Sequence, residues 1–264
     1  MLFGVNVKTS SPSTINTNRL ESGFQKLASG KKLNSAKDDA AAIHIFTSLI
    51  AEQNGNAVAI RNANDGVSFA QVADGALQSV TDNLNRVEAL AIQANSGALS
   101  ASDRSAIQSE VEQLQAGIAQ TIESTNFAGK PVFSRESIQF QVSSNNGEIQ
   151  SYSVDVSQVL EQLSNLDVSS QLKAGQSLEL AKELREGVND LQSDLASFSN
   201  SIYQSVNTNR ETQLVSIAGR QRIESTEYAL ESSKGVAFQL KLDVDIALRA
   251  QSNALPNGID KLLS

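Results

Sequence analysis

The chain has 264 residues, a net charge of -8 and no cysteine. This charge argues against a nucleic-acid-binding surface, because phosphate contacts need clustered Lys and Arg, and the sequence has no basic stripe. Without cysteine there is neither a disulfide framework nor a thiolate metal site. Only 5% of the residues are aromatic and Trp is absent, so the composition favours an elongated helical protein over a compact core built on aromatic side chains.

The N-terminal part shows two helical patterns separated by turn-forming residues. Leu20, Phe24 and Leu27 have helical spacing, Ser29–Gly30 interrupts them, and the pattern resumes from Asp38. The second pattern leads into the first of two long heptad seams.

The two heptad seams lie on either side of a middle segment that has none. In both, apolar residues follow in alternating steps of three and four, the spacing that keeps one helix facing another over a long distance. The first seam comprises Ala70, Ala73, Leu77, Val80, Leu84, Val87, Ala91 and Ala94, and the second comprises Ala181, Leu184, Val188, Leu191, Leu195, Phe198 and Ile202. Because helices of this length need partners, we predict that the N-terminal and C-terminal portions pair.

A further helix is expected after the first seam. Asn95–Gly97 ends the seam helix, and Ser102 or Asp103 caps the next one. Its apolar face comprises Ile107, Val111, Leu114 and Ile118. The short connection predicts that these two helices lie antiparallel.

The middle segment changes to a period of two. Apolar and polar residues alternate over residues 138–142 and again over 152–156, and Asn145–Gly147 between them tolerate positive φ. We expect a β-hairpin, packed against the helices because a hairpin alone is only marginally stable.

Beyond the second seam the heptad positions become polar before apolar residues return. The polar positions are Ser205, Asn209, Thr212 and Ser216, and apolar residues return between 223 and 247. We interpret the polar stretch as the boundary between a long helix and a terminal segment. The predicted fold is mainly α: an elongated antiparallel helical bundle or coiled coil formed by the N- and C-terminal segments, with a small β-hairpin region in the middle.

Several motifs occur in a fixed order along the chain. They are Ala28–Ala41 (ASGKKLNSAKDDAA), Arg61–Gly66 (RNANDG), Arg86–Asn95 (RVEALAIQAN) and, at the other end, Ala250–Pro256 (AQSNALP). Together they resemble bacterial flagellin, over residues 15–130 and again near the C-terminus. The chain departs from the family pattern in residues 236–249, where a typical member is richer in Ala, Gln and Gly.

The resemblance implies a division of the chain into five segments. The expected segments are 1–40, the N-terminal part of an inner coiled coil; 41–134, the N-terminal part of a helical stalk; 135–172, the hairpin region; 173–222, the C-terminal helix of the stalk; and 223–264, the C-terminal part of the inner coiled coil. The expected stalk core comprises Leu77, Leu84, Val111, Leu114, Leu184, Leu191, Leu195 and Phe198. With only a hairpin in the middle, the chain resembles a minimal flagellin without outer variable domains.

The resemblance also implies a structural subunit that polymerises into the extracellular flagellar filament for swimming motility. Its expected partners are further copies of itself, a flagellar secretion chaperone, and the cap and hook-junction proteins. The N-terminal residues lack a charged region followed by an apolar region and a cleavage site, so export without a cleaved signal peptide is expected. No apolar run approaches the ~18 residues of a membrane span, so membrane insertion is not expected.

Other functional classes stay open as alternatives. A hook-filament junction or adaptor protein has similar terminal helices. An enzyme is not expected, and neither is a cofactor or metal, because His44 is the only histidine and no HExxH motif is present. Asp38–Asp39 are interpreted as residues at a helix N-terminus, and Gly30, Gly66 and Gly75 as helix interruptions.

Arg86, Leu90 and Glu110 are candidate contacts for an innate immune receptor. In many flagellins the matching positions are bound by the vertebrate Toll-like receptor that senses flagellin. Glu88 departs from the pattern, since many recognised flagellins carry a basic residue there. The alternative interpretation is an ordinary stalk surface involved in subunit packing.

The two chain ends carry opposite charges. Residues 1–40 hold six Lys or Arg and three Asp or Glu, whereas residues 223–264 hold four and six. Both ends are sparsely apolar, so we expect them to be disordered in the monomer and ordered by neighbouring subunits. We expect rod-shaped subunits to join head to tail through two different surfaces, an arrangement that generates an open helical filament when it does not close.

Overall fold

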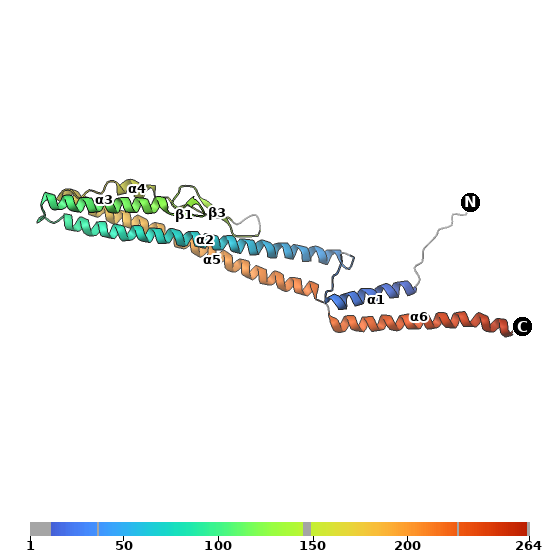
Figure 1. Cartoon of the computed structure of the whole chain (residues 1–264). Coiled ribbons are helices and arrows are strands. Elements are labelled where there is room, and N and C mark those ends of the chain that lie inside the picture. The colour runs from blue at the N-terminus through green and yellow to red at the C-terminus, as the bar shows by residue number, and fades with distance from the viewer. Residues whose placement is uncertain (1–11, 36, 145–148, 226, 263–264) are drawn as a thin grey trace, which may run out of the picture. The chain divides into compact units, whose positions relative to one another are not determined.

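A computed structural model describes residues 12–35, 37–144, 149–225 and 227–262 of the chain. The described residues form the helices α1 (Pro12–Ser29), α2 (Ala40–Ala94), α3 (Ala101–Ser124), α4 (Ser157–Leu163), α5 (Gln171–Glu224) and α6 (Tyr228–Leu262). They also form two antiparallel strand pairs, β1 (Asn126–Phe127) with β2 (Lys130–Pro131) and β3 (Ile138–Gln141) with β4 (Ile149–Tyr152). The predicted mainly α fold of long packed helices with a small hairpin is confirmed (Figure 1).

The chain divides into two compact units, which we call the terminal unit (residues 1–51 and 215–264) and the central unit (residues 52–214). Helices α2 and α5 each contribute to both units. The domain boundaries predicted at residues 40 and 223 stay a prediction.

The central unit is built on two seams that pack against each other. On α2 the seam runs in steps of three and four from Asn56 to Ala94, and every position is buried. On α5 it runs with the same steps from Ala174 to Thr212 in the central unit and on to Ser216 in the terminal unit, and every position is buried except Leu191 and Thr212, which are partly buried. Both seams are therefore longer than their apolar parts alone indicate.

Contacts between the seams show that α2 and α5 are antiparallel. The Glu88 carboxylate lies 3.5 Å from the Arg185 guanidinium, and Gln192 donates to the Asp74 carboxylate at 3.4 Å. Residue numbers on α5 rise as those on α2 fall, as expected for two ends of a chain that pair. Helix α3 packs on α2 through Arg86 and Glu110, which agrees with the predicted antiparallel pair.

The polar stretch of α5 is part of this seam. Ser205, Asn209 and Ser216 are all buried. The Asn209 amide donates to the carbonyl of Val142 at 2.6 Å, and the Asn62 amide on α2 donates to the neighbouring carbonyl of Gln141 at 3.1 Å. These two asparagines donate to adjacent backbone carbonyls at and just beyond the end of β3, so they link α5 and α2 to the hairpin.

The hairpin forms with Ile138 opposite Tyr152 and Gln141 opposite Ile149. Its second strand therefore lies earlier than residues 152–156, where alternation had placed it. Val154 and Val156 are buried outside the strand, because their apolar side chains pack into the core without strand pairing. The turn predicted at residues 145–147 lies outside the described residues.

The interpretation of three glycines as helix interruptions holds only for Gly30. Gly30 has φ of 68° and follows the end of α1. Gly66 and Gly75 lie inside α2, which is continuous. Gly66 is a point of close approach, since a Cβ there would lie 2.6 Å from Cδ1 of Ile202 and 3.3 Å from the Phe140 ring.

The terminal unit contains the antiparallel pair α1 and α6 (Figure 1). The Phe238 ring of α6 has two cations near its face, Arg19 at 5.8 Å and Lys241 at 6.0 Å. Where α1 and α5 end, Lys31 pairs with Glu224 at 2.8 Å and the Lys32 N–H donates to the Glu224 carbonyl. The two chain ends are therefore tied together by both backbone and side chains.

Candidate functional site

Arg86 and Glu110 form a surface ion pair between α2 and α3. The Arg86 guanidinium donates through Nη2 at 2.6 Å and Nε at 2.9 Å to one oxygen of Glu110. Both side chains are exposed, by 57% and 44%. In the isolated chain, both side chains are therefore accessible to a binding partner.

Leu90, the third candidate receptor contact, is 2% exposed and belongs to the core. This placement corrects its expected role as a surface contact. Because α5 packs on the seam of α2 and α3 packs beside it, α2 buries a stripe wider than the seam, and Leu90 falls within it. Receptor recognition through Arg86 and Glu110 stays a prediction.

Glu88 lies between α2 and α5, where its carboxylate pairs with Arg185 at 3.5 Å. The two side chains are only 25% and 33% exposed. Glu88, the residue that departs from the family pattern, thus forms a contact between α2 and α5.

The residues expected in the stalk core all lie in the central unit. Leu77, Leu84, Val111, Leu184, Leu195 and Phe198 are buried, and Leu114 and Leu191 are partly buried against them. An aromatic series connects the hairpin to this core, with the Tyr152 ring stacked on Phe198 at 4.6 Å and Phe140 at 6.1 Å from Phe198. Burial raises the pKa of Tyr152 to about 12.

Sequence patterns did not reveal how the end of α2 is held. The Arg104 guanidinium donates to the carbonyls of Ala94, Ser96 and Leu99 at 2.8–3.0 Å. It thereby satisfies the carbonyl of the last residue of α2 and ties it to the loop that leads into α3. The capping box of α3, in which the Ser100 hydroxyl accepts from Asp103 N–H, lies beside it; here the N-cap is Ser100, two residues before Ser102.

The terminal unit differs from the central unit in burial. Every buried hydrophobic side chain among the described residues lies between Ala59 and Val206, within the central unit. The terminal unit instead exposes large apolar side chains, namely Phe24, Ile45, Val215, Leu230, Val236, Leu240, Val244, Ile246 and Leu248. Its helices therefore lack an apolar core of their own within the described part of one chain.

Within the described ranges, no group of His, Asp and Glu is arranged to hold a metal ion. No helix in that part of the chain combines the length and apolarity that crossing a lipid bilayer requires.

Long heptad-paired helices with an exposed apolar helix pair define a helical structural protein. The family described as the bacterial flagellin N-terminal helical region matches residues 4–137, half of the chain, and this chain belongs to the flagellin family. Flagellin D of Vibrio anguillarum is 36% identical over 184 residues, covering 67% of this chain and 46% of that protein. The chain thus spans less than half the length of this relative.

Two solved structures share the fold. The crystal structure of Bacillus cereus flagellin has a TM-score of 0.52 and 24% identity, covering 56% of this chain and 88% of the other. A putative flagellar hook-associated protein from Vibrio parahaemolyticus has a TM-score of 0.63 and 15% identity, covering 71% of this chain and all of the other. At these identities the likeness concerns the fold alone.

Proposed function

We propose that this chain is a structural subunit that polymerises into the flagellar filament, outside the cell, for swimming motility. The observation that carries the proposal is the contrast in burial between the units. The terminal unit exposes nine large apolar side chains, and no hydrophobic side chain among its described residues is buried. Large apolar side chains exposed in this number, in a unit whose described residues bury none, indicate an interaction surface.

The apolar surface of α6 follows one side of the helix. Val236, Leu240, Val244 and Leu248 recur every four residues and are 51–69% exposed. This spacing places them on neighbouring positions of one helix face. We propose that further copies of the chain pack against this apolar face in a helical polymer. A secretion chaperone is the proposed cover before assembly, and export without a cleaved signal peptide belongs to the same proposal.

Seeded growth tests the proposal. Purified chain added to filament fragments is expected to extend them into long tubes visible by electron microscopy. Leu240→Asp should abolish extension while leaving monomer helix content unchanged, because Leu240 is 63% exposed in the single chain. The matched control Gln239→Glu adds a carboxylate at the neighbouring exposed position, about 100° around the helix, and should extend seeds normally.

A hook-filament junction protein is the alternative function. It would occupy a few copies at the filament base rather than many along its length. Quantifying the chain in purified filaments distinguishes the two, and a ratio of only a few copies per filament would contradict the filament-subunit proposal.

A further inference from the structure

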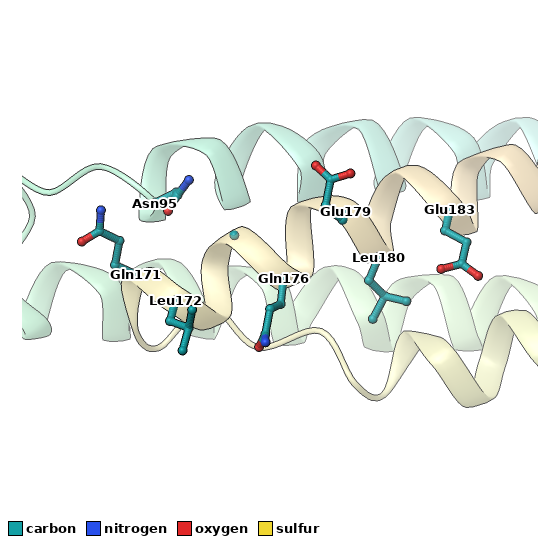
Figure 2. Close-up of a pocket in the computed structure, with 8 residues that line it drawn as sticks. Asn95, Gln171, Leu172, Gln176, Glu179, Leu180 and Glu183 are labelled. Carbon is teal, nitrogen blue, oxygen red and sulfur yellow. The ribbon is translucent and has the colours of Figure 1, made fainter.

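Leu172, in the first turn of α5, is the most exposed of the large apolar side chains described, at 76%. It lies in a broad groove of about 790 Å3 that Asn95, Gln176, Leu180 and Glu183 also line. In Figure 2 the Leu172 and Leu180 side chains point to one side of α5, and the Glu179 carboxylate points to the other. A single exposed leucine needs no explanation. Leu172, however, lies beside two glutamates in the lining of one groove.

Within the part of the chain that the structure describes, the lining of this groove carries one negative charge that is not paired. Glu179 and Glu183 are the charged residues in its lining, and both are exposed. Lys182 offsets Glu179 at 3.0 Å. Among the described residues no ion pair is found for Glu183, so an incoming cation would meet an available carboxylate.

A smaller hollow lies in the terminal unit. Its volume is about 220 Å3, and its apolar lining consists of Leu33, Ile43 and Phe46. The charged residues in its lining, Lys31 and Glu224, pair with each other at 2.8 Å. Small-molecule sites occupy roughly 300–1,000 Å3, so this hollow suits a single aliphatic side chain better than a ligand. Thr47 lies in the same lining and is exposed.

The loop beside this hollow presents positive charge outward. Lys32 and Lys37 are exposed on it. Its two acidic residues face backbone N–H groups instead: Asp38 accepts from Asn34 at 2.9 Å, and Asp39 accepts from Ala42 at 3.0 Å at the start of α2. Hydrogen bonds to Asn34 lower the pKa of Asp38.

We propose that Leu172 of one copy inserts into the hollow formed by Leu33, Ile43 and Phe46 of a second copy, with Glu183 facing Lys32 and Lys37. This contact rests on the filament function proposed above and identifies one of the surfaces that build it. The projection belongs to the central unit and the hollow to the terminal unit. Because the two surfaces differ, the contact is head to tail, and each copy can donate at one surface and accept at the other.

Disulfide cross-linking tests the pairing directly, because the chain contains no cysteine. Leu172→Cys and Thr47→Cys are made as separate chains, mixed, and grown from seeds under mild oxidation. Covalent dimers are expected in filaments of the mixture and absent from unpolymerised mixtures. Each variant alone and a mixture of Ser79→Cys with Thr47→Cys are the controls, since Ser79 is exposed on α2 away from the groove lining.

Charge exchange provides the second readout. Glu183→Lys and Lys32→Glu should each slow seeded growth at least tenfold, and the double variant should recover most of the wild-type rate. Leu172→Ser should slow growth similarly with an unchanged monomer circular dichroism spectrum. If wild type extends seeds, normal growth of Leu172→Ser together with no cross-links between the Leu172→Cys and Thr47→Cys chains would overturn this contact alone. Failure of wild type to extend seeds would overturn the filament function and this contact with it.

Discussion

At the scale of single residues, Gly66 shows how a seam position can be set by its neighbours. In the helix interior glycine costs about 1 kcal/mol relative to alanine. At Gly66 a Cβ would meet Cδ1 of the buried Ile202 at 2.6 Å, whereas at Gly75 on the same helix nothing lies within 4 Å. The same substitution should therefore have opposite effects at the two positions.

We predict that Gly66→Ala lowers the free energy of unfolding by about 1–3 kcal/mol through overpacking, and that Gly75→Ala raises it by about 0.5–1 kcal/mol. Urea unfolding followed by circular dichroism measures both. In an Ile202→Val background, which removes Cδ1, Gly66→Ala should cost clearly less. Equal effects at the two glycines would show that the close approach is absent.

Arginines 86 and 104 offer a second contrast at this scale. Arg104 donates to the carbonyl of the last residue of α2 and to two carbonyls of the following loop, whereas Arg86 makes an exposed ion pair. Arg104→Ala should lower the free energy of unfolding by about 2–3 kcal/mol, and Arg86→Ala by less than about 1 kcal/mol. Arg104→Lys should not restore stability, because a single ammonium does not reproduce the planar fork. If both alanine variants melt at the wild-type temperature, the three hydrogen bonds of Arg104 do not stabilise the end of α2.

At the scale of elements, the segment between α4 and α5 is held by polar contacts on both sides. The Ser177 hydroxyl of α5 accepts from the Asp167 N–H and donates to the Asp167 carbonyl, both at 2.8 Å. The Gln108 side chain of α3 accepts from Val168 N–H at 2.7 Å. Lys173 donates to the Asp167 carboxylate at 2.7 Å. This network positions the start of α5, and with it the exposed Leu172.

The network makes the free energy of unfolding depend on pH in the acid range. The hydrogen bond from Lys173 is the main cause that lowers the pKa of Asp167 to about 2 from its ordinary 3.8. A carboxyl with a lowered pKa in the folded state contributes stability above pH 3.8, and the contribution is lost as the pH falls towards about 2. The Asp167 side chain is 40% exposed, so solvent screens part of the effect.

Asp167→Asn should therefore flatten the loss of unfolding free energy between about pH 4 and pH 2, as measured by urea unfolding at several pH values. Glu161→Gln is the control, since the Glu161 side chain is exposed on α4 and lies outside this network, so the wild-type slope should persist. An unchanged slope in Asp167→Asn would exclude the carboxylate as a contributor.

At the scale of the whole molecule, the two units should differ in stability because they differ in buried apolar area. The central unit holds the buried hydrophobic residues from Ala59 to Val206, whereas α6 exposes much of its apolar surface. Regions with few buried contacts open at low free energy. The helices of the terminal unit are therefore expected to be protected mainly when other copies cover them.

Brief trypsin treatment of the monomer should remove residues from both ends first and leave a folded fragment that contains residues 52–214. Mass spectrometry of the fragment and its failure to extend seeds are the measurements. Assembled filaments are the control and should protect the same sites. Chain ends that resist trypsin in the monomer, or a trimmed fragment that still polymerises, would show that assembly does not depend on ordering the terminal unit.

Local spacing was sufficient to predict the long helices, the two seams and the presence of a hairpin, though not the position of its second strand, because a repeat of 3.5 or 2 residues is a property of each segment alone. The flagellin motifs at residues 28–104 were equally readable, and the family match includes them. The continuation of the α5 seam through Ser205 and Asn209 could have been found from spacing too, had polar residues been counted at seam positions.

Other features depended on which segments meet in space. Leu90 and Arg86 stand four residues apart on α2, yet one is buried and the other exposed, because of where α3 and α5 pack. Gly66 is a contact with Ile202 and Phe140 rather than a break, and Asn209 donates to the carbonyl of Val142. Each of these roles is set by a partner distant in sequence, and no local pattern specifies which partner that is.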